Sequence, residues 1–241
     1  MIRLDQLLLD LGLSPSLKGA GALIMTGKVL VDEQVIDKAG TLISPACSVR
    51  IRDSCQFVSR GGLKLQGALT HFGIDPSGWI CVDIGASTGG FTDCLLQAGA
   101  SRVYAVDVAY GILDWKIRSD PRVITVERCN ARNLNKENVP EPIDFGVFDT
   151  SFISPTKIIP AVIPLFANNR KRILALVKPQ FELLPTKIDR GGIVNDEADR
   201  LEAVEKIINF CGDQGMKSNG FIESPIKGVK GNQEYLVYFG D

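Results

Sequence analysis

The sequence predicts an α/β protein whose main part is a mostly parallel β-sheet covered by helices on both faces. From Ser59 onward, short apolar segments alternate with segments of helical periodicity at regular distances along the chain. The apolar segments are hydrophobic on both faces, as in strands that are buried on both sides. The residues before Ser59 follow another pattern, so a small α+β unit is expected ahead of the sheet. We therefore predict two domains, residues 1–58 and 59–241.

The main domain is predicted from runs of apolar residues that are separated by helical stripes. Leu65, Ala68, Leu69 and Phe72 are spaced as one face of a helix, and a long helix is indicated around Val204. The final two strands follow that helix. The expected strands cover residues 79–84, 102–107, 123–126, 145–148, 173–177, 220–222 and 235–239.

The small unit is predicted to contain two short helices and a hairpin. Leu4, Leu7, Leu8 and Leu11 recur at helical spacing until Gly12 ends the first helix. Either Ser14 or Ser16 can cap a second helix, whose inward side chains are Ala20, Leu23 and Ile24 and which Gly27 ends. Short strands are then expected at residues 29–31, 34–36 and 41–43.

Composition narrows the class of protein. The chain has 241 residues, of which 45% are hydrophobic and 23% charged, as expected for a soluble globular protein. Its longest apolar stretch, residues 158–167, contains two prolines and is shorter than the roughly 20 residues of a membrane-spanning helix. No secretory signal is apparent at the start, so we expect a cytoplasmic protein that does not bind membranes. Six cysteines without a Cys-x-x-Cys pair, and one histidine, argue against a metal site or a disulfide framework.

Charge is distributed unevenly along the chain. The formal net charge is -1, so any contact with nucleic acid has to come from a local patch. Residues 1–65 contain eight lysines and arginines against six acidic residues, a net charge of +2, which leaves -3 for the rest. This asymmetry is mild, and it favours the N-terminal part as the nucleic-acid contact.

The strongest local signal is the segment of residues 81–91, which runs from a strand through a glycine-rich turn into a helix. Its spacing differs from Gly-x-Gly-x-x-Gly, so the usual dinucleotide cradle is not predicted. Glycines there allow a ligand close to the backbone, and the helix start can receive a carboxylate. Asp83, just before the first glycine, suits an amino group or the water around it.

Two further strand ends fit a nucleoside. Asp107 ends the second strand, about 20 residues after the glycine turn, where a carboxylate can accept both ribose hydroxyls. Asn130 and Ala131 follow the third strand, where an adenine could be held. An adenosyl group with an amino-acid tail matches these sites together, and S-adenosylmethionine fits best. The candidate cofactor-binding residues are Asp83, Gly85, Ser87, Gly89, Gly90, Phe91, Asp107, Asn130 and Ala131.

Charged residues also occur at positions that a hydrophobic core would exclude. Asp149 follows the fourth strand, and Lys178 follows the fifth. A lysine directly after a buried apolar strand is expected to be partly desolvated, which makes it a candidate base. Lys64 lies near the start of the main domain, and Glu234 precedes the last strand. Taken singly, each is better explained as a solvated charge or part of a structural ion pair than as a catalyst.

Ordered motifs along the whole chain resemble those of the TlyA-type rRNA 2′-O-methyltransferases, which are also called haemolysins, with a catalytic domain similar to the FtsJ type. Residues 3–43 resemble an S-four RNA-binding domain, and residues 58–65 resemble the junction between the family's two domains. The remaining matches, in order, are residues 83–91, 127–131, 149–154, 176–182, 191–194 and 231–235.

The resemblance implies a fold, a reaction and a set of residues. The expected fold is a Rossmann-like class I methyltransferase, with a seven-stranded, mostly parallel sheet whose last strand is antiparallel. The implied reaction moves a methyl group from S-adenosylmethionine to a ribose 2′-hydroxyl of ribosomal RNA, with a cytidine as the expected target. The partner would be ribosomal RNA or a ribosomal subunit. A catalytic Lys-Asp-Lys-Glu tetrad falls on Lys64, Asp149, Lys178 and Glu234.

In this scheme Lys178 deprotonates or polarises the 2′-hydroxyl and Asp149 holds Lys178, while Lys64 and Glu234 orient the ribose. One departure from the family concerns the second helix, where glycines and Leu17 occupy positions at which members carry more polar residues. The expected RNA contacts are Arg3, Lys18, Lys28 and Arg60, with Arg50 and Arg52 as further candidates. Two alternatives are a non-catalytic RNA-binding assembly factor and a membrane-lytic haemolysin, although the chain offers no free apolar element for the latter.

Overall fold

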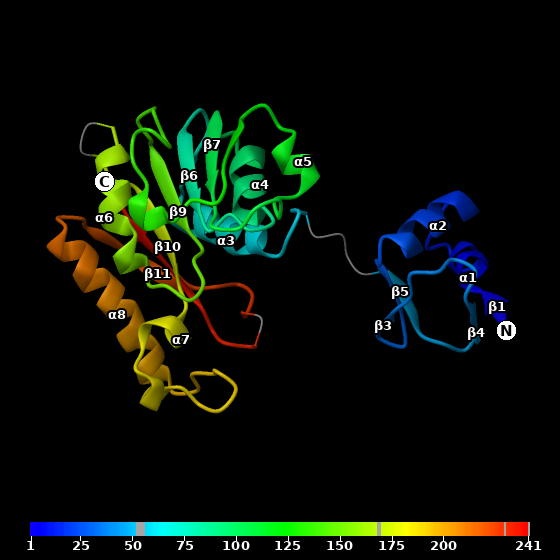
Figure 1. The fold of residues 1–241 in the computed structure, drawn as a ribbon. Coiled ribbons are helices and arrows are strands. Elements are labelled where there is room, and N and C mark those ends of the chain that lie inside the picture. The colour runs from blue at the N-terminus through cyan, green and yellow to red at the C-terminus, as the bar shows by residue number, and fades with distance from the viewer. Residues whose placement is uncertain (52–55, 168–169, 229, 241) are drawn as a thin grey trace. The chain divides into compact units, whose positions relative to one another are not determined.

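The protein is described by a computed structural model that covers residues 1–51, 56–167, 170–228 and 230–240. The chain divides into two compact units, Met1–Cys55 and Gln56–Asp241, which are drawn in Figure 1 and described separately below. The first unit is a small α+β fold, and the second is a layered α/β fold.

The small unit packs two helices on short antiparallel strands. β2 (Val29–Val31) pairs with β3 (Gln34–Val35) and with β5 (Val49–Ile51), while β1 (Ile2–Arg3) pairs with β4 (Leu42–Ile43). The helices are α1 (Leu4–Asp10) and α2 (Leu17–Met25). Their core contains Leu4, Leu8, Ala20, Ile24 and Val29, all fully buried.

Ser16 and not Ser14 caps α2, because the Ser16 side chain accepts the Gly19 N–H at 3.1 Å. Leu11, the last leucine of the predicted helical repeat, lies just outside the helix. Leu11 follows the last residue of α1 and is 52% exposed, because the chain leaves the helix there and turns at Gly12 with a φ of 69°. The strands β1 and β5 were not predicted, because β1 runs directly into α1 and β5 pairs with β2 and not with the strand next to it in the sequence.

The large unit is built on one seven-stranded sheet with the order β11-β12-β10-β9-β6-β7-β8. Strands β8, β7, β6, β9 and β10 are parallel, and β12 is antiparallel to both β10 and β11. This confirms the predicted seven-stranded sheet with an antiparallel last strand. The strands are β6 (Ile80–Ile84), β7 (Arg102–Val106), β8 (Val123–Val126), β9 (Phe145–Phe148), β10 (Ile173–Val177), β11 (Ser218–Glu223) and β12 (Tyr235–Phe239).

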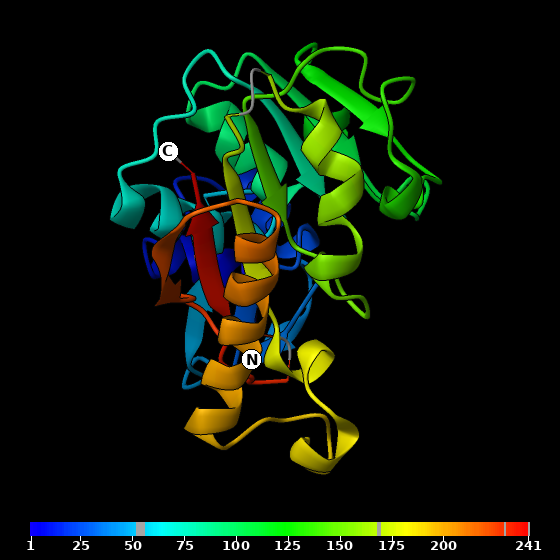
Figure 2. The same cartoon turned by 90° about the vertical axis from the view of Figure 1, so that its left-hand side faces the viewer.

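Helices cover both faces of this sheet. α6 (Ile159–Val162) and α8 (Glu197–Asp213) lie on one face, in front of the strands in Figure 2, and α3 (Gly61–Phe72) and α4 (Gly90–Gln97) lie on the other. Ala203, Val204 and Ile207 of α8 join the strands in one buried core. Asp196 caps α8 by accepting the Asp199 N–H. The remaining short elements are α5 (Trp115–Arg118), α7 (Pro179–Glu182), η1 (Ala131–Asn133), η2 (Pro155–Lys157), η3 (Ile163–Leu165) and η4 (Pro185–Lys187).

The topology decides where functional side chains can meet. Parallel strands all end at the same edge of a sheet, so the residues after β6, β7, β8, β9 and β10 gather there. β12 runs in the opposite direction and therefore begins at this edge. Glu234, which directly precedes β12, is thus brought to the edge that carries Asp149 and Lys178.

Candidate active site

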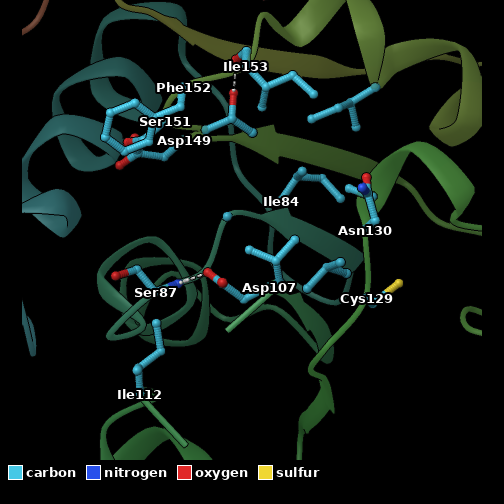
Figure 3. Close-up of a pocket in the computed structure, with 16 residues that line it drawn as sticks. Ile84, Ser87, Asp107, Ile112, Cys129, Asn130, Asp149, Ser151, Phe152 and Ile153 are labelled. Atoms are coloured by element: carbon cyan, nitrogen blue, oxygen red, sulfur yellow. Dashed lines mark hydrogen bonds between the residues drawn. The ribbon is translucent and has the colours of Figure 1, made fainter. Parts of the chain in front are cut away.

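A cavity of about 360 Å³ opens at the carboxyl ends of the parallel strands, and we call it the first cavity. Figure 3 shows Ser87 and Asp107 on one side of it and Ser151 and Phe152 on the other. Among the described residues that line it, none is a lysine or an arginine. Its lining comprises Ile84, Gly85, Ser87, Val106, Asp107, Val108, Ile112, Cys129, Asn130, Ala131, Asp149, Thr150, Ser151, Phe152, Ile153 and Ile158.

The glycine turn after β6 allows the surrounding backbone to come close. Gly85 has a φ of 85°, and a Cβ at this position would lie 2.5 Å from the Asp149 carbonyl oxygen. Gly89 has a φ of 95°, and its Cβ would lie 2.9 Å from a Leu113 methyl group. Ser87, between them, adopts a positive φ of 51°. Side chains are therefore excluded from the two glycine positions by space as well as by conformation.

Asp107 faces the first cavity and organises the glycine turn. One carboxylate oxygen accepts the Ser87 N–H at 2.8 Å, and the other accepts the Ala109 N–H at 2.8 Å. Each carboxylate oxygen has a second lone pair, so both remain able to accept a ligand hydroxyl. The predicted use of Asp107 for ribose hydroxyls is compatible with this arrangement.

Asp83 is fully buried beneath the glycine turn, outside the lining of the first cavity. Its Oδ2 accepts the Thr92 hydroxyl at 2.6 Å, whereas its Oδ1 has no hydrogen-bond partner. Burial raises the pKa of the Asp83 carboxyl to about 7, an effect that the nearby Asp149 and Asp107 carboxylates increase and the Thr92 hydroxyl opposes. A buried carboxylate oxygen without a partner is an acceptor for a cationic group.

Asn130 and Ala131 line the first cavity beyond β8. The Asn130 side chain accepts the Arg132 N–H at 3.1 Å and so caps η1, which fixes Ala131 against the cavity. Glu127, at the end of β8, accepts the Gly111 N–H at 2.9 Å and pairs with Arg118. These contacts hold the two loops that border this end of the cavity.

The four residues of the predicted tetrad form two ion pairs. Lys178 Nζ lies 2.6 Å from Asp149 Oδ1 and donates to Ser151 Oγ at 3.0 Å. Lys64 Nζ, from α3, donates to Glu234 Oε2 at 2.5 Å. The second pair is the more buried, since its side chains are 11% and 4% exposed. A buried pair of this kind holds both side chains in fixed positions.

A second cavity of about 230 Å³ adjoins the first, with which it shares Gly85, Ser87 and Asp149. It contains the cations Arg60, Lys64 and Lys227. Neither Arg60 nor Lys227 has an ion-pair partner among the described residues. Its lining comprises Ser59, Arg60, Gly61, Lys64, Gly85, Ala86, Ser87, Thr88, Gly90, Phe91, Asp149, Ile226, Lys227 and Gly228.

Gly90 and Phe91, which were predicted as cofactor ligands, line this second cavity and not the first. A Cβ on Gly90 would lie 2.2 Å from Ser59 Oγ, and the Phe91 ring lies beside Gly61. The start of α4 therefore packs tightly against the start of α3. The predicted cofactor residues thus divide between two adjoining cavities, except Asp83 and Gly89, which line neither.

The basic residues predicted to bind RNA differ in whether they already form an ion pair. Arg3 pairs with Asp5 at 2.6 Å, and Arg50 pairs with Glu33 at 2.5 Å. Lys18 is exposed and Lys28 half-buried, and neither has a partner among the described residues. Arg60 belongs to the large unit and lines the second cavity. Arg52 lies outside the described residues.

Three residues of the site were not predicted from the sequence. Thr92 lies one turn into α4, where it reaches Asp83. Phe152 is 89% exposed at the rim of the first cavity and has a φ of 67°. Lys227 lies in the loop before β12. Whether an aromatic ring is exposed, and which cavity a loop residue lines, depend on tertiary structure, and the spacing of residues along the sequence does not predict either.

Among the described residues, no helix combines the length and the apolar character that a membrane-spanning segment requires. The same residues also contain no group of three or more His, Cys, Asp or Glu side chains arranged to hold a metal ion.

Comparison with known proteins agrees with this geometry. Residues 57–241 match the FtsJ-like methyltransferase family, and residues 2–46 match the S4 domain. Hemolysin A of Brachyspira hyodysenteriae is 40% identical over 99% of both chains. The 16S/23S rRNA (cytidine-2′-O)-methyltransferase TlyA of Mycobacterium tuberculosis is 40% identical over 98% of this chain and 88% of its own.

Solved structures agree as well. A protein from Streptococcus thermophilus, 37% identical, superposes with a TM-score of 0.77 over 100% of this chain and 88% of its own. Fibrillarin of Aeropyrum pernix, in complex with S-adenosyl-L-methionine, has a TM-score of 0.51 at 13% identity, over 74% of this chain and 76% of its own, and so shares the fold. The chain belongs to the FtsJ-like methyltransferase family, as a TlyA-type member that also has an S4 domain.

Proposed function

We propose that this protein transfers a methyl group from S-adenosylmethionine to the 2′-hydroxyl of a cytidine ribose in ribosomal RNA. The relative from Mycobacterium tuberculosis carries that activity in its name. The observation that carries the proposal is the Lys178–Asp149 pair, which lies where two cavities of opposite charge adjoin. Such a border is where a cationic cofactor and an anionic substrate would meet.

The residues present fit the cofactor. The first cavity has room for an adenosyl group, with Asp107 for the ribose and with Asn130 and Ala131 beside the base. Bound there, S-adenosylmethionine would supply an electrophilic methyl group on a sulfonium that is already a good leaving group. Gly85, Ser87, Gly90 and Phe91 border the space for its amino-acid tail, and Gly89 shapes the turn between them.

Asp83 is the proposed acceptor for positive charge on that tail. Its Oδ1 is buried without a hydrogen-bond partner, so it can accept a hydrogen bond from an ammonium group of the ligand. Because its pKa is raised to about 7, the unliganded protein holds a proton on Asp83 in weakly acidic solution. A cation at this position would favour loss of that proton.

Lys178 is the proposed group that handles the ribose hydroxyl. Its ammonium group donates one hydrogen bond to Ser151 and forms an ion pair with Asp149, so it keeps N–H capacity for the hydroxyl oxygen. In that form Lys178 orients and polarises the hydroxyl. In its neutral form the same Nζ would accept the hydroxyl proton. Asp149 holds Nζ in place in both cases.

Lys64 and Glu234 are proposed to orient the ribose from the other side. Their ion pair joins α3 to the start of β12 and brings a cation to the second cavity. Glu234 compensates the charge of Lys64. Lys64 can therefore be buried without the loss of stability that an unpaired buried charge would cause. The pair would hold the sugar in line with the methyl donor.

RNA binding is proposed to involve both units. Residues 1–58 would grip ribosomal RNA or a subunit through Arg3, Lys18 and Lys28, and residues 59–241 would perform the reaction, with Arg60 as a further RNA contact at the second cavity. The exposed ring of Phe152 would stack on the target base. We propose further that the protein acts in the cytoplasm, and that it needs neither a metal nor a membrane.

The test is methyl transfer from labelled S-adenosylmethionine to rRNA and ribosomal subunits that lack the modification, followed by mapping of 2′-O-methyl groups. We expect one or a few modified cytidines, and none with the Lys178→Ala variant. If the protein binds cofactor and rRNA but transfers no methyl group to any ribosomal substrate, the proposed reaction is refuted.

A further inference from the structure

A buried hydrogen bond joins the two elements on either side of the glycine turn. α4 begins at Gly90, at the end of this turn, and Thr92 is the third residue of the helix. The Thr92 hydroxyl donates a hydrogen bond to Oδ2 of Asp83, near the end of β6, at 2.6 Å. Both residues are fully buried. A hydrogen bond from a hydroxyl to a carboxylate is among the stronger ones in proteins, so this contact fixes the helix start against the strand end.

The two oxygens of the Asp83 carboxylate differ in their contacts. Thr92 binds Oδ2, whereas Oδ1 is buried and accepts no hydrogen bond. Buried polar atoms of folded proteins almost always have a partner, so an oxygen without one indicates a place for a ligand atom or a water molecule. The carboxylate cannot turn without breaking the one hydrogen bond that it accepts from the described side chains. The direction in which Oδ1 points therefore depends on Thr92.

The other charged groups near Asp83 do not favour its ionised form. Burial raises the pKa of Asp83, and the carboxylates of Asp107, after β7, and Asp149, after β9, raise it further. None of the ion pairs found among the described residues includes Asp83. Thr92 has the opposite effect and favours the carboxylate. The remaining titratable groups on β6 and α4 are Cys81, Asp93 and Cys94, and burial keeps the two thiols neutral by raising their pKa.

We propose that Thr92 is a positioning residue for the cofactor. Its buried hydroxyl fixes Oδ2 of Asp83 and keeps the carboxylate ionised, so that Oδ1 receives the ammonium group of S-adenosylmethionine, directly or through one water molecule. This inference rests on the role proposed above for Asp83. Thr92 lines neither cavity, so it acts on the cofactor only through Asp83.

Two substitutions separate the hydroxyl from the shape of the side chain. Thr92→Ser keeps the donor, whereas Thr92→Val removes it and leaves a branched side chain of nearly the same size. Without the donor, the ionised carboxylate would be buried with neither oxygen partnered, so the pKa of Asp83 should rise further. Should Thr92→Val fail to fold, Thr92→Ala removes the same hydroxyl and introduces a better helix former.

The first measurement is the titration of the Asp83 carboxyl carbon by carbon-13 NMR in the unliganded protein, with the signal assigned by Asp83→Asn. The wild type should titrate near pH 7. Thr92→Val should titrate about one pH unit higher, as expected for the loss of a hydrogen bond to a charged group. Thr92→Ser should titrate with the wild type. An unchanged midpoint in Thr92→Val overturns the inference, whatever the protein methylates.

The second measurement is the Kd of S-adenosylmethionine by calorimetry as a function of pH. Each variant's Kd is divided by that of the wild type at the same pH, which cancels the titration of the cofactor's own amino group. For Thr92→Val this ratio should be about 10 at pH 6 and fall below about threefold at pH 8.5, where the carboxylate is mostly ionised in both proteins. Thr92→Ser should give a ratio near unity throughout. So should the control Thr70→Val, which changes a threonine of α3 outside both cavities.

The two measurements distinguish the possible failures. A Kd ratio that is raised equally at every pH would show that Thr92 only stabilises the fold, which overturns the proposal. If the NMR midpoints move as expected but Asp83→Asn binds the cofactor as tightly as the wild type does, the role proposed for Asp83 is refuted. The effect of Thr92 on the cofactor is then refuted with it, while the effect of the hydrogen bond on the carboxylate stands.

Discussion

The two cavities of the active site adjoin at Gly85, Ser87 and Asp149, yet they differ in charge. The first cavity is lined by Asp107, Asp149, uncharged polar residues and apolar side chains, with no lysine or arginine among its described residues. The second is lined by Arg60, Lys64 and Lys227, of which only Lys64 has a described ion-pair partner. One turn of glycines therefore separates a region that attracts cations from a region that attracts anions.

The difference explains how one sheet edge can receive two ligands of opposite charge, because each ligand needs surroundings of the opposite sign. S-adenosylmethionine carries a sulfonium, and RNA carries a phosphate on every nucleotide. If each cavity favours one of them, the ligands approach each other only at the shared border, where Asp149 holds Lys178.

The largest effect is expected at the border. Lys178→Ala should lower kcat by about 10³-fold or more, because the group that orients or deprotonates the hydroxyl is lost. Cofactor affinity measured by calorimetry should stay within about threefold, since Lys178 does not line the first cavity. Lys217→Ala, an exposed lysine outside both cavities, is the control. Comparable loss of cofactor binding in Lys178→Ala would contradict the separation of the two ligands.

A pH series tests the cationic side. Burial raises the pKa of Asp83 in the folded protein from its ordinary value of 3.8 to about 7, so the carboxyl is mostly protonated at pH 6 and mostly ionised at pH 8. If the cofactor binds only the ionised form, its affinity should rise about tenfold between these values. Asp83→Asn should bind cofactor more weakly at pH 8 and show a flat profile. A wild-type profile that is equally flat would remove Asp83 from this role.

The same shift affects the unliganded protein with a defined sign. Between about pH 4 and pH 7 the folded state retains a proton on Asp83 that the unfolded state has lost. The contribution of Asp83 to the free energy of unfolding therefore falls as pH rises through this window and levels off above it. Asp83→Asn should cancel this decrease, so its stability relative to the wild type should increase toward pH 8. Chemical denaturation at several pH values measures it.

A smaller effect is expected at the exposed ring over the first cavity. Phe152→Ala should lower kcat/KM for rRNA about tenfold, in keeping with the loss of one stacked base. Phe152→Trp should retain most of the activity, because it keeps an aromatic face. Phe221→Ala, which removes a partly exposed ring on β11, is the control. Equal activity of the Ala and Trp variants would show that no base stacks on this residue.

The smallest effect is expected on the anionic side. Lys227→Met should raise KM for rRNA about threefold and reduce the slope of log KM against log salt by somewhat less than 1, as for one lost phosphate contact. The cofactor dissociation constant should not change. If instead the cofactor binds more weakly and the salt slope is unaltered, the second cavity serves the cofactor's carboxylate and not the RNA.

The sheet could be predicted from the sequence because its signals are local. Seven apolar runs, each bounded by turn residues, give the strands to within a residue or two at most ends. The charges at strand ends were also visible, since Asp149 and Lys178 follow apolar runs directly. The small unit was predicted from its helical repeats and from the S-four resemblance. The strands β1 and β5 were missed, because β1 runs directly into α1 and β5 pairs with β2, which is distant in the sequence.

The division of the site into two cavities could not be predicted, because it depends on contacts between distant segments. Gly90 and Phe91 belong to the glycine turn in sequence, yet α3 packs against them and places them in the second cavity. Lys64 and Glu234 are 170 residues apart, and only the reversed direction of β12 brings them together. Spacing along a chain contains no information on which face of a helix meets another helix.

The position of β12 between β10 and β11 links the integrity of the sheet to the completeness of the site. Among the strands that the structure describes, β11 pairs only with β12, and Glu234 directly precedes β12, so one pairing event both secures an edge strand and delivers a carboxylate to Lys64. Molecules in which this pairing has come apart would be inactive before they are globally unfolded. Turnover would then serve as a sensitive indicator of local opening at this edge, in heat or in denaturant, at concentrations where bulk spectroscopic probes still report a native protein.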